Sequence, residues 1–181
     1  MNVIDAIKER RAYRSLEEIE ITEEIIKDLA NSAILAPSCF NNQPEKFIFV
    51  VSKDKLNNLF SSLSRGNEWA HYASMVIVVY SRKDFDCDIK GREYYLFDTG
   101  MAVGFLILRA TELGLVAHPI AGYDEDKVKE ILNIEVDMKV ITLIIVGKHY
   151  SKIRDVLTEK QKIQEEVRPE RKNFEEFAKI L

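Results

Sequence analysis

The chain alternates between segments with helical spacing of apolar residues and short apolar runs that favour strands. Apolar residues three and four positions apart predict amphipathic helices. This spacing occurs in four segments, residues 3–9, 23–36, 53–63 and 124–132. Short runs rich in β-branched and aromatic residues predict strands instead. Three such runs occur, at residues 46–51, 75–80 and 140–146. The mixture predicts a domain in which helices pack on a sheet.

The longest helical pattern covers residues 92–113 and is expected to form a central helix. Gly100, Ala102 and Gly104 lie along its middle, although glycine inside a helix costs about 1 kcal/mol relative to alanine. We therefore expect another backbone to pack closely against these small residues. Gly114 is expected to end the helix as the residue after its C-cap.

After Gly147 the chain becomes polar, and residues 148–172 cannot form a core of their own. Asn173 and Glu176 predict a capping pair for a last short helix. The apolar residues of that helix are Phe174, Phe177 and Ile180. A polar arm that ends in an apolar helix suggests docking on a second subunit. Packing of the arm on its own domain is the alternative.

Composition indicates one globular domain, residues 1–181, with 46% hydrophobic and 31% charged residues. The net charge of −4 argues against nonspecific nucleic-acid binding. No apolar run approaches the roughly 20 residues that span a bilayer, and the first residues show no signal-peptide pattern. Cys39 and Cys87 are expected to be free thiols in a reducing compartment. We therefore expect a cytoplasmic protein with no membrane association.

A cluster of cations follows the first helix. Lys8, Arg10, Arg11 and Arg14 place four cations in seven positions. One interpretation is a solvated helix end, where the helix dipole favours cations. The other is an anion site, because the arginine fork matches phosphate geometry.

A second cluster lies between the predicted second helix and the first strand. Pro37 and Pro44 stiffen this turn because each restricts the residue before it. The turn carries four neutral hydrogen-bonding side chains, Ser38, Asn41, Asn42 and Gln43. Such groups suit the edge of a flat heteroaromatic ring, since amides both donate and accept without charge. Alternatively, they satisfy only the turn backbone.

Other catalytic motifs are missing from the sequence. It has no dinucleotide fingerprint, phosphate-binding P-loop or nucleophile elbow. His71, His118 and His149 lack metal-ligand spacing, so we expect no metal site. Cys39 is more readily explained as a packed turn thiol than as a nucleophile. If the protein is an enzyme, a bound cofactor is expected to carry the chemistry.

Four motifs, in order along the chain, resemble those of the FMN-dependent nitroreductase family. Residues 10–14, RRAYR, resemble its R-R-S-x-R opening, and residues 36–44, APSCFNNQP, resemble its A-P-S-x-x-N-x-Q-P-W stretch. Asp98 through Gly122 resembles the family's D-x-x-x-A…L-G-L…G-[FY] segment, and residues 171–176, RKNFEE, resemble its R-K-P-L-E-E tail. The resemblance covers nearly the whole chain.

This resemblance implies an α+β fold with a mainly antiparallel sheet, flanking helices and a long central helix. It also implies an intertwined homodimer with two FMN sites, each built from both subunits. The implied activity is a ping-pong reaction, in which NAD(P)H passes hydride to FMN and a small organic acceptor, such as a nitroaromatic or a quinone, is then reduced. No protein acid or base is required, so no catalytic residue is assigned.

The resemblance also implies which residues contact FMN. The phosphate, ribityl and pyrimidine contacts fall to Arg10, Arg11, Ala12, Arg14 and Arg171, with Lys172 as a further candidate. The ring contacts fall to Ser38, Asn41, Gln43, Pro119, Ile120, Ala121 and Gly122. Ser38 is expected to come from the partner subunit, and a backbone N–H near Ala121 or Gly122 is expected to meet N5 of the ring.

Two departures from the family motifs leave other functions open. Ala12 replaces a serine, which removes a hydrogen bond worth roughly 0.5–1.5 kcal/mol. Glu45 replaces the tryptophan that follows Gln-Pro in the family. The alternatives are a related flavin enzyme that carries out reductive dehalogenation or flavin fragmentation, and a non-catalytic flavin-binding dimer.

Overall fold

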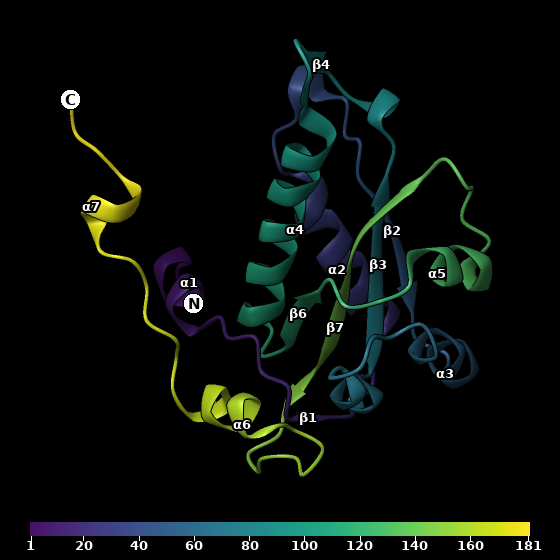
Figure 1. The fold of residues 1–181 in the computed structure, drawn as a ribbon, viewed down its shortest axis with the longest axis vertical. Helices are drawn as coiled ribbons and strands as arrows, with labels where there is room; N and C mark the ends of the chain where they lie inside the picture. The colour runs from purple at the N-terminus through teal and green to yellow at the C-terminus, as the bar shows by residue number, and fades with distance from the viewer.

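The centre of the computed structural model, which describes residues 1–181, is a five-stranded antiparallel sheet (Figure 1). On one side, β7 (Lys139–His149) pairs with β3 (Met75–Ser81), which pairs with β2 (Lys46–Val50). On its other side, β7 pairs with β6 (Val116–Ile120). The end of β7, beyond β3, also pairs with the short β1 (Leu16–Glu17). The expected α+β fold with an antiparallel sheet is confirmed.

Both faces of this sheet are buried, and β3 shows why its sequence is continuously apolar. Met75, Ile77 and Val79 point into one core, whereas Val76 and Val78 point into the other. All five side chains are at most 1% exposed. Because successive residues of a strand face opposite sides, a strand between two cores needs apolar residues at every position.

Helices cover each face of the sheet (Figure 1). Residues of α2 (Glu23–Ile34) and α4 (Tyr94–Glu112) contribute to one core. Residues of α3 (Lys53–Phe60), α5 (Glu125–Leu132) and the 3₁₀ helix η2 (Glu68–Tyr72) contribute to the other. The long helix expected at the centre is therefore α4, which lies beside α2 on one side of the sheet.

Side-chain caps fix where several helices begin. The side chain of Thr22 accepts from the N–H of Ile25 at the start of α2, and Asp124 accepts from Lys127 at the start of α5. Asn2 caps α1 (Val3–Glu9) in the same way. Such a cap contributes about 1 kcal/mol to the stability of a helix.

The small residues of α4 do not have the role that we expected. A Cβ atom added to Gly100 or Gly104 would meet no atom of the chain within 4 Å. Within the chain, the prediction of a closely packed backbone at these glycines is therefore wrong. The outward surface of α4 also carries exposed Leu96, Phe97 and Phe105. The helix thus presents small and apolar residues away from its own core.

Two remaining segments lie outside the main sheet. The charged segment of residues 82–91 contains the 3₁₀ helix η3 (Lys83–Phe85) and begins the small hairpin of β4 (Asp88–Ile89) and β5 (Arg92–Glu93). The chain ends with α6 (Glu159–Glu166) and the short α7 (Phe174–Phe177).

The C-terminal segment extends away from the rest of the chain, with α7 standing clear of the sheet (Figure 1). The side chains of Phe174, Phe177 and Ile180 are 49%, 69% and 84% exposed. The Asn173–Glu176 capping box is present as expected, although the helix ends before Ile180. No helix in the structure combines the length and apolarity needed to cross a bilayer.

Candidate functional site

The arginine loop (residues 10–15) joins α1 to β1, and a carboxylate from the other end of the chain holds its backbone. Glu165, in the last turn of α6, accepts from the N–H of Arg14 at 2.8 Å and from the N–H of Ser15 at 2.9 Å. The Glu165 side chain is buried, and both of its oxygens are occupied by these bonds. It therefore orders the loop.

Arginine side chains complete the contact between this loop and α6. Arg11 Nη2 donates to the carbonyl oxygen of Gln164 at 2.9 Å, and Arg14 Nη1 donates to Gln164 Oε1 at 3.2 Å. In the opposite direction, Arg168 Nη2 donates to the carbonyl oxygen of Arg10 at 2.8 Å. Cations near the C-terminus of a helix are favoured by its exposed carbonyl groups. Chain segments about 150 residues apart thus form one unit.

Between these segments lies a cavity of about 230 Å³, which we call the arginine cavity. Its lining is formed by Arg10, Arg11, Ala12, Arg14, Gln164, Arg168, Pro169 and Arg171. None of its five arginines forms an ion pair; the arginine ion pairs of the structure belong to Arg82 and Arg109. Burial lowers the pKa of Arg10, and the neighbouring guanidinium groups of Arg168, Arg171 and Arg11 lower it further.

The arginine cavity fits a phosphate dianion. Guanidinium groups present N–H donors in the planar arrangement that phosphate oxygens accept, and their mutual repulsion is relieved when an anion binds. The structure thus favours the anion-site interpretation of residues 10–14 over a solvated helix end. Lys172 does not line the cavity and is exposed.

The proline-bracketed turn (residues 38–43) is held largely by its own side chains. The N–H of Gln43 donates to Ser38 Oγ at 3.0 Å, and Gln43 Nε2 donates to the carbonyl oxygen of Asn41 at 3.0 Å. The N–H of Cys39 donates to Oδ2 of Asp98 in α4 at 2.6 Å. Ser38 and Gln43 therefore satisfy the turn backbone, as the alternative interpretation expected. The Asn41 side chain is exposed and forms no such bond.

This turn is also strained. Phe40, Asn41 and Gln43 have φ angles of 49°, 59° and 50°, in the left-handed region that residues other than glycine rarely adopt. The side chain of Phe40 is nevertheless 87% exposed, so packing within the chain does not compensate for the strain. Strained residues of this kind are concentrated at functional sites.

The third predicted set, Pro119, Ile120, Ala121 and Gly122, spans the end of β6 and the two residues after it. Pro119 and Ala121 are exposed, Ile120 is buried, and Gly122 is half-buried. The Gly122 carbonyl accepts from Asn67 Nδ2 at 2.9 Å, and a Cβ on Gly122 would lie only 2.5 Å from that nitrogen. A glycine at this position therefore accommodates the close approach of Asn67.

A buried histidine connects β6 to the arginine loop. His118 Nδ1 lies 3.1 Å from the carbonyl oxygen of Tyr13 and donates to it, and the imidazole stacks on the ring of Trp69. Burial lowers the pKa of His118 to about 4, with a smaller contribution from the positive charge of Arg14. The neutral imidazole thus holds the end of β6, with Pro119–Gly122, beside the arginine loop.

Within one chain, the proline-bracketed turn lies apart from the arginine loop and from the end of β6. The N–H of Cys39 donates to Asp98 in the first turns of α4. In contrast, β6 comes after the last turn of α4 in the chain, and it contacts the arginine loop through His118 and Tyr13. A 19-residue helix is about 28 Å long at 1.5 Å per residue. None of the five main cavities of the chain is lined by residues of both the turn and the arginine loop.

The expectation of free thiols is wrong, because Cys39 and Cys87 form a disulfide. Their Cα atoms are 6.2 Å apart, although 48 positions separate them in sequence. The sequence gives no indication of this pairing, because it depends on how the loop before β4 folds back onto the turn. Cys39, Asp86 and Cys87 have ligand atoms close enough to hold a metal, but the disulfide removes both thiolates.

Several residues of the arginine cavity were missed by the sequence analysis. Arg168, Gln164 and Pro169 line it, and Glu165 and His118 support it from behind. Arg168 lies three residues before Arg171, and this short spacing is the only feature of the sequence that points to Arg168 as a cavity residue. Glu165 gives none, because its sequence neighbours are an ordinary polar helix.

Comparisons with known proteins agree with the fold and the motifs. A sequence model of the nitroreductase family matches residues 61–148. An oxygen-insensitive NADPH nitroreductase from Helicobacter acinonychis is 26% identical over 162 residues, which cover 70% of this chain and 77% of that protein.

Solved structures extend the similarity to the rest of the chain. The crystal structure of a nitroreductase family protein from Clostridium novyi has a TM-score of 0.78 and 28% identity, covering 83% of this chain and 87% of that one. The crystal structure of an oxidoreductase containing FMN has a TM-score of 0.82 and 26% identity, covering 96% of this chain and 88% of that one. Residues 61–148 therefore match the nitroreductase family, and the fold of nearly the whole chain is that of solved nitroreductase family proteins.

Proposed function

We propose that the protein is an FMN-dependent oxidoreductase that uses NAD(P)H to reduce a small organic acceptor, of the nitroaromatic or quinone type. The arginine cavity is the observation that carries this proposal. It gathers five cationic side chains without a paired carboxylate, and it lies beside the β6 residues that we expect at the flavin ring. The NADPH nitroreductase from Helicobacter acinonychis supports the choice of nicotinamide reductant and nitro acceptor.

The side chains of Arg10, Arg11, Arg14, Arg168 and Arg171 would hold the FMN phosphate. Bound FMN supplies the redox chemistry, by accepting hydride from the nicotinamide and reducing the acceptor. The exposed Pro119 and Ala121 provide a small, flat surface for the ring. Glu165 and His118 keep the arginine loop and β6 together but face away from the ligand.

The proposal includes a homodimer, because one chain does not bring the turn and the arginine cavity together. In a dimer, the turn of one subunit would meet the flavin that is held by the arginine loop of its partner. Two features provide contact surface for this assembly. The outer face of α4 combines exposed Phe97 and Phe105 with uncovered Gly100 and Gly104. The C-terminal arm, about residues 148–181, ends in apolar side chains that contact nothing in their own chain core.

The cytoplasmic location expected from the sequence also remains part of the proposal. Disulfides in that compartment are rare, and those that occur are usually transient or redox-sensing. The Cys39–Cys87 disulfide is therefore an unusual feature for a protein of this kind.

The proposal is tested by NADH and NADPH oxidation with added FMN, in the presence and absence of nitrofurazone or menadione. We expect acceptor-dependent oxidation. Arg171→Ala removes one cation from the cavity and should weaken FMN binding about 5- to 10-fold, corresponding to about 1–1.4 kcal/mol for an exposed charge-assisted contact.

Lys53→Ala is the matched control, because it removes one exposed cation from α3 that does not line the arginine cavity. It should leave FMN affinity unchanged. Absence of FMN binding by the wild-type protein, or equal affinity in the wild type and Arg171→Ala, would contradict the proposal.

A further inference from the structure

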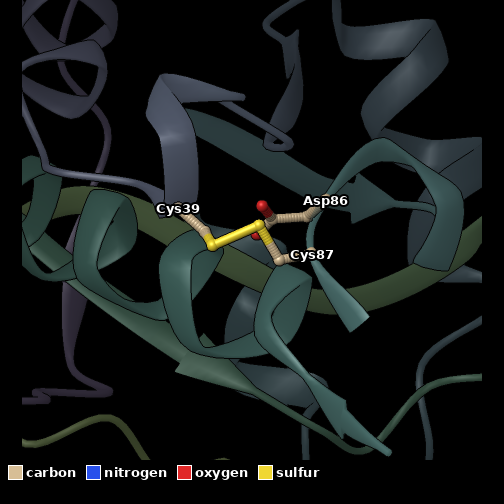
Figure 2. Close-up of side chains that lie close together, drawn as sticks. All are labelled: Cys39, Asp86 and Cys87. Atoms are coloured by element: carbon tan, nitrogen blue, oxygen red, sulfur yellow. A yellow bond between two sulfur atoms is a disulfide. The ribbon is translucent and has the colours of Figure 1, made fainter. Parts of the chain in front are cut away.

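The Cys39–Cys87 disulfide joins the proline-bracketed turn to the loop that precedes β4 (Figure 2). Both cysteines are only half-buried, so a small thiol can reach the sulfur atoms. Neither residue belongs to either apolar core of the sheet. The cross-link therefore constrains a surface turn and not the centre of the fold.

The turn depends on this cross-link because its backbone conformation is unfavourable. Three of its residues are left-handed, as described above, and L residues in that region are destabilised by contacts of their Cβ atoms. Two contacts hold the turn in this conformation, and both are made with the loop that carries Cys87. Asn42 Nδ2 donates to Asp86 Oδ1 at 3.1 Å and approaches Cys87 Sγ at 3.6 Å. Breaking the disulfide would loosen all of these contacts together.

The surroundings of the disulfide also suit proton transfer. Figure 2 shows the Asp86 carboxyl beside the two sulfur atoms. Asp86 Oδ2 is buried and has no hydrogen-bond partner in the structure. Burial raises the pKa of Asp98, and the adjacent Asp86 carboxyl raises it further. A carboxyl group with a raised pKa, that of Asp98, therefore lies close to the disulfide.

We propose that Cys39 and Cys87 form a thiol–disulfide exchange site that takes a dithiol reductant, and that reduction at this site releases the turn of residues 38–43. Reduction is expected to weaken FMN binding as well, and this expectation rests on the proposed function, in which the turn forms part of the partner's flavin site. Release of the turn itself does not depend on FMN.

The exchange proceeds in two balanced steps. A thiolate of the reductant attacks Cys39 Sγ, the S–S bond breaks, and Cys87 leaves as a thiolate. Cys87 is the better leaving group, because Asn42 Nδ2 points at its sulfur and stabilises the thiolate. That thiolate takes a proton from solvent, with the nearby Asp98 carboxyl as a relay. The second thiol of the reductant then attacks the mixed disulfide and releases Cys39. Two electrons and two protons pass to the protein, and the reductant becomes a disulfide.

The test compares hydrogen exchange of the turn in the oxidised and reduced protein. Dithiothreitol is added to the folded protein, and thiol alkylation confirms that two thiols per chain form. We expect the backbone N–H groups of Cys39, Asn42 and Gln43, all hydrogen-bonded in the oxidised turn, to exchange at least about tenfold faster after reduction. The N–H groups of β3 should not change.

The double variant Cys39→Ser/Cys87→Ser is the matched control, because it removes the cross-link at nearly constant volume. Its turn should exchange at the fast rate with and without dithiothreitol. Two results would each overturn the proposal: a disulfide that yields no thiols until the protein unfolds, or an exchange rate in the turn that reduction leaves unchanged.

A second measurement connects the site to the proposed function. Reduction should weaken FMN binding at least about fivefold in the wild type, the factor expected if the free turn spends about a fifth of its time in the bound conformation. The double serine variant should bind FMN equally with and without dithiothreitol. If FMN binds in neither redox state, the proposed function fails, while hydrogen exchange still decides whether the turn is released.

Discussion

His118 should make the stability of the protein sensitive to mild acid. Its imidazole is 7% exposed, and burial lowers its pKa from 6.5 to about 4. Between these two values the unfolded chain binds a proton that the folded protein does not bind, so the free energy of unfolding falls as the pH falls. The full loss over this window is 2.5 pKa units, or about 3.4 kcal/mol.

Most of that loss should be visible between pH 7 and pH 4.5. With the same two pKa values, His118 alone lowers the free energy of unfolding by about 2.4 kcal/mol over this interval. Other groups titrate in the same range, since burial lowers the pKa of His149 from 6.5 and raises that of Glu45 from 4.5. The contribution of His118 must therefore be isolated by comparison with a variant.

Urea unfolding of the wild type and of His118→Asn at both pH values provides this comparison. Asparagine keeps an N–H donor for the Tyr13 carbonyl but does not titrate, so the variant should lose about 2.4 kcal/mol less than the wild type on acidification. His71→Gln, which changes an exposed histidine, should behave like the wild type. Equal losses in the wild type and in His118→Asn would refute the reasoning.

Two further predictions concern how the arginine loop and the turn are held. Glu165→Gln replaces one carboxylate oxygen by an NH₂ group that faces a backbone donor, and should lower the free energy of unfolding by about 2–3 kcal/mol in urea titration. The exposed Glu166→Gln is the control, and equal stability of the two variants would contradict the role of Glu165. Phe40→Gly should raise the melting temperature, because glycine avoids a left-handed penalty of about 1 kcal/mol, and should weaken FMN binding. A lower melting temperature would show that the conformation at Phe40 is not strained.

Much of the fold was predictable because it depends on local patterns. The β-branched run that forms β3 and the caps at Thr22 and Asp124 are each set by a few adjacent residues. Element boundaries were less certain: the long helix begins at Tyr94, because a hairpin occupies residues 88–93 before it.

The candidate site was only partly predictable, because its supports come from distant segments. The arginines at positions 10–14 and 171 were found from motifs, and the structure brings them to one cavity. Glu165 and His118 act through backbone groups of the arginine loop, and no local pattern signals such contacts. The Cys39–Cys87 disulfide was not predictable for the same reason, because two cysteines far apart in sequence give no information about their distance in the fold.

The central claim is that the arginine cavity of one subunit and the turn of its partner form a single flavin site. Mixed dimers test it most directly. One variant, Arg10→Ala/Arg171→Ala, removes cations from the cavity. The other, Asn41→Gly/Gln43→Gly, removes both amide side chains while suiting the left-handed backbone.

Each variant alone should bind FMN poorly. When the two are co-refolded in equal amounts, half of the dimers should be mixed, and each mixed dimer should contain one site with both sets intact. FMN titration should then recover about a quarter of the wild-type sites at wild-type affinity. Recovery of no wild-type sites, although mixed dimers form, would contradict the claim and would place both sets of residues in one chain's site.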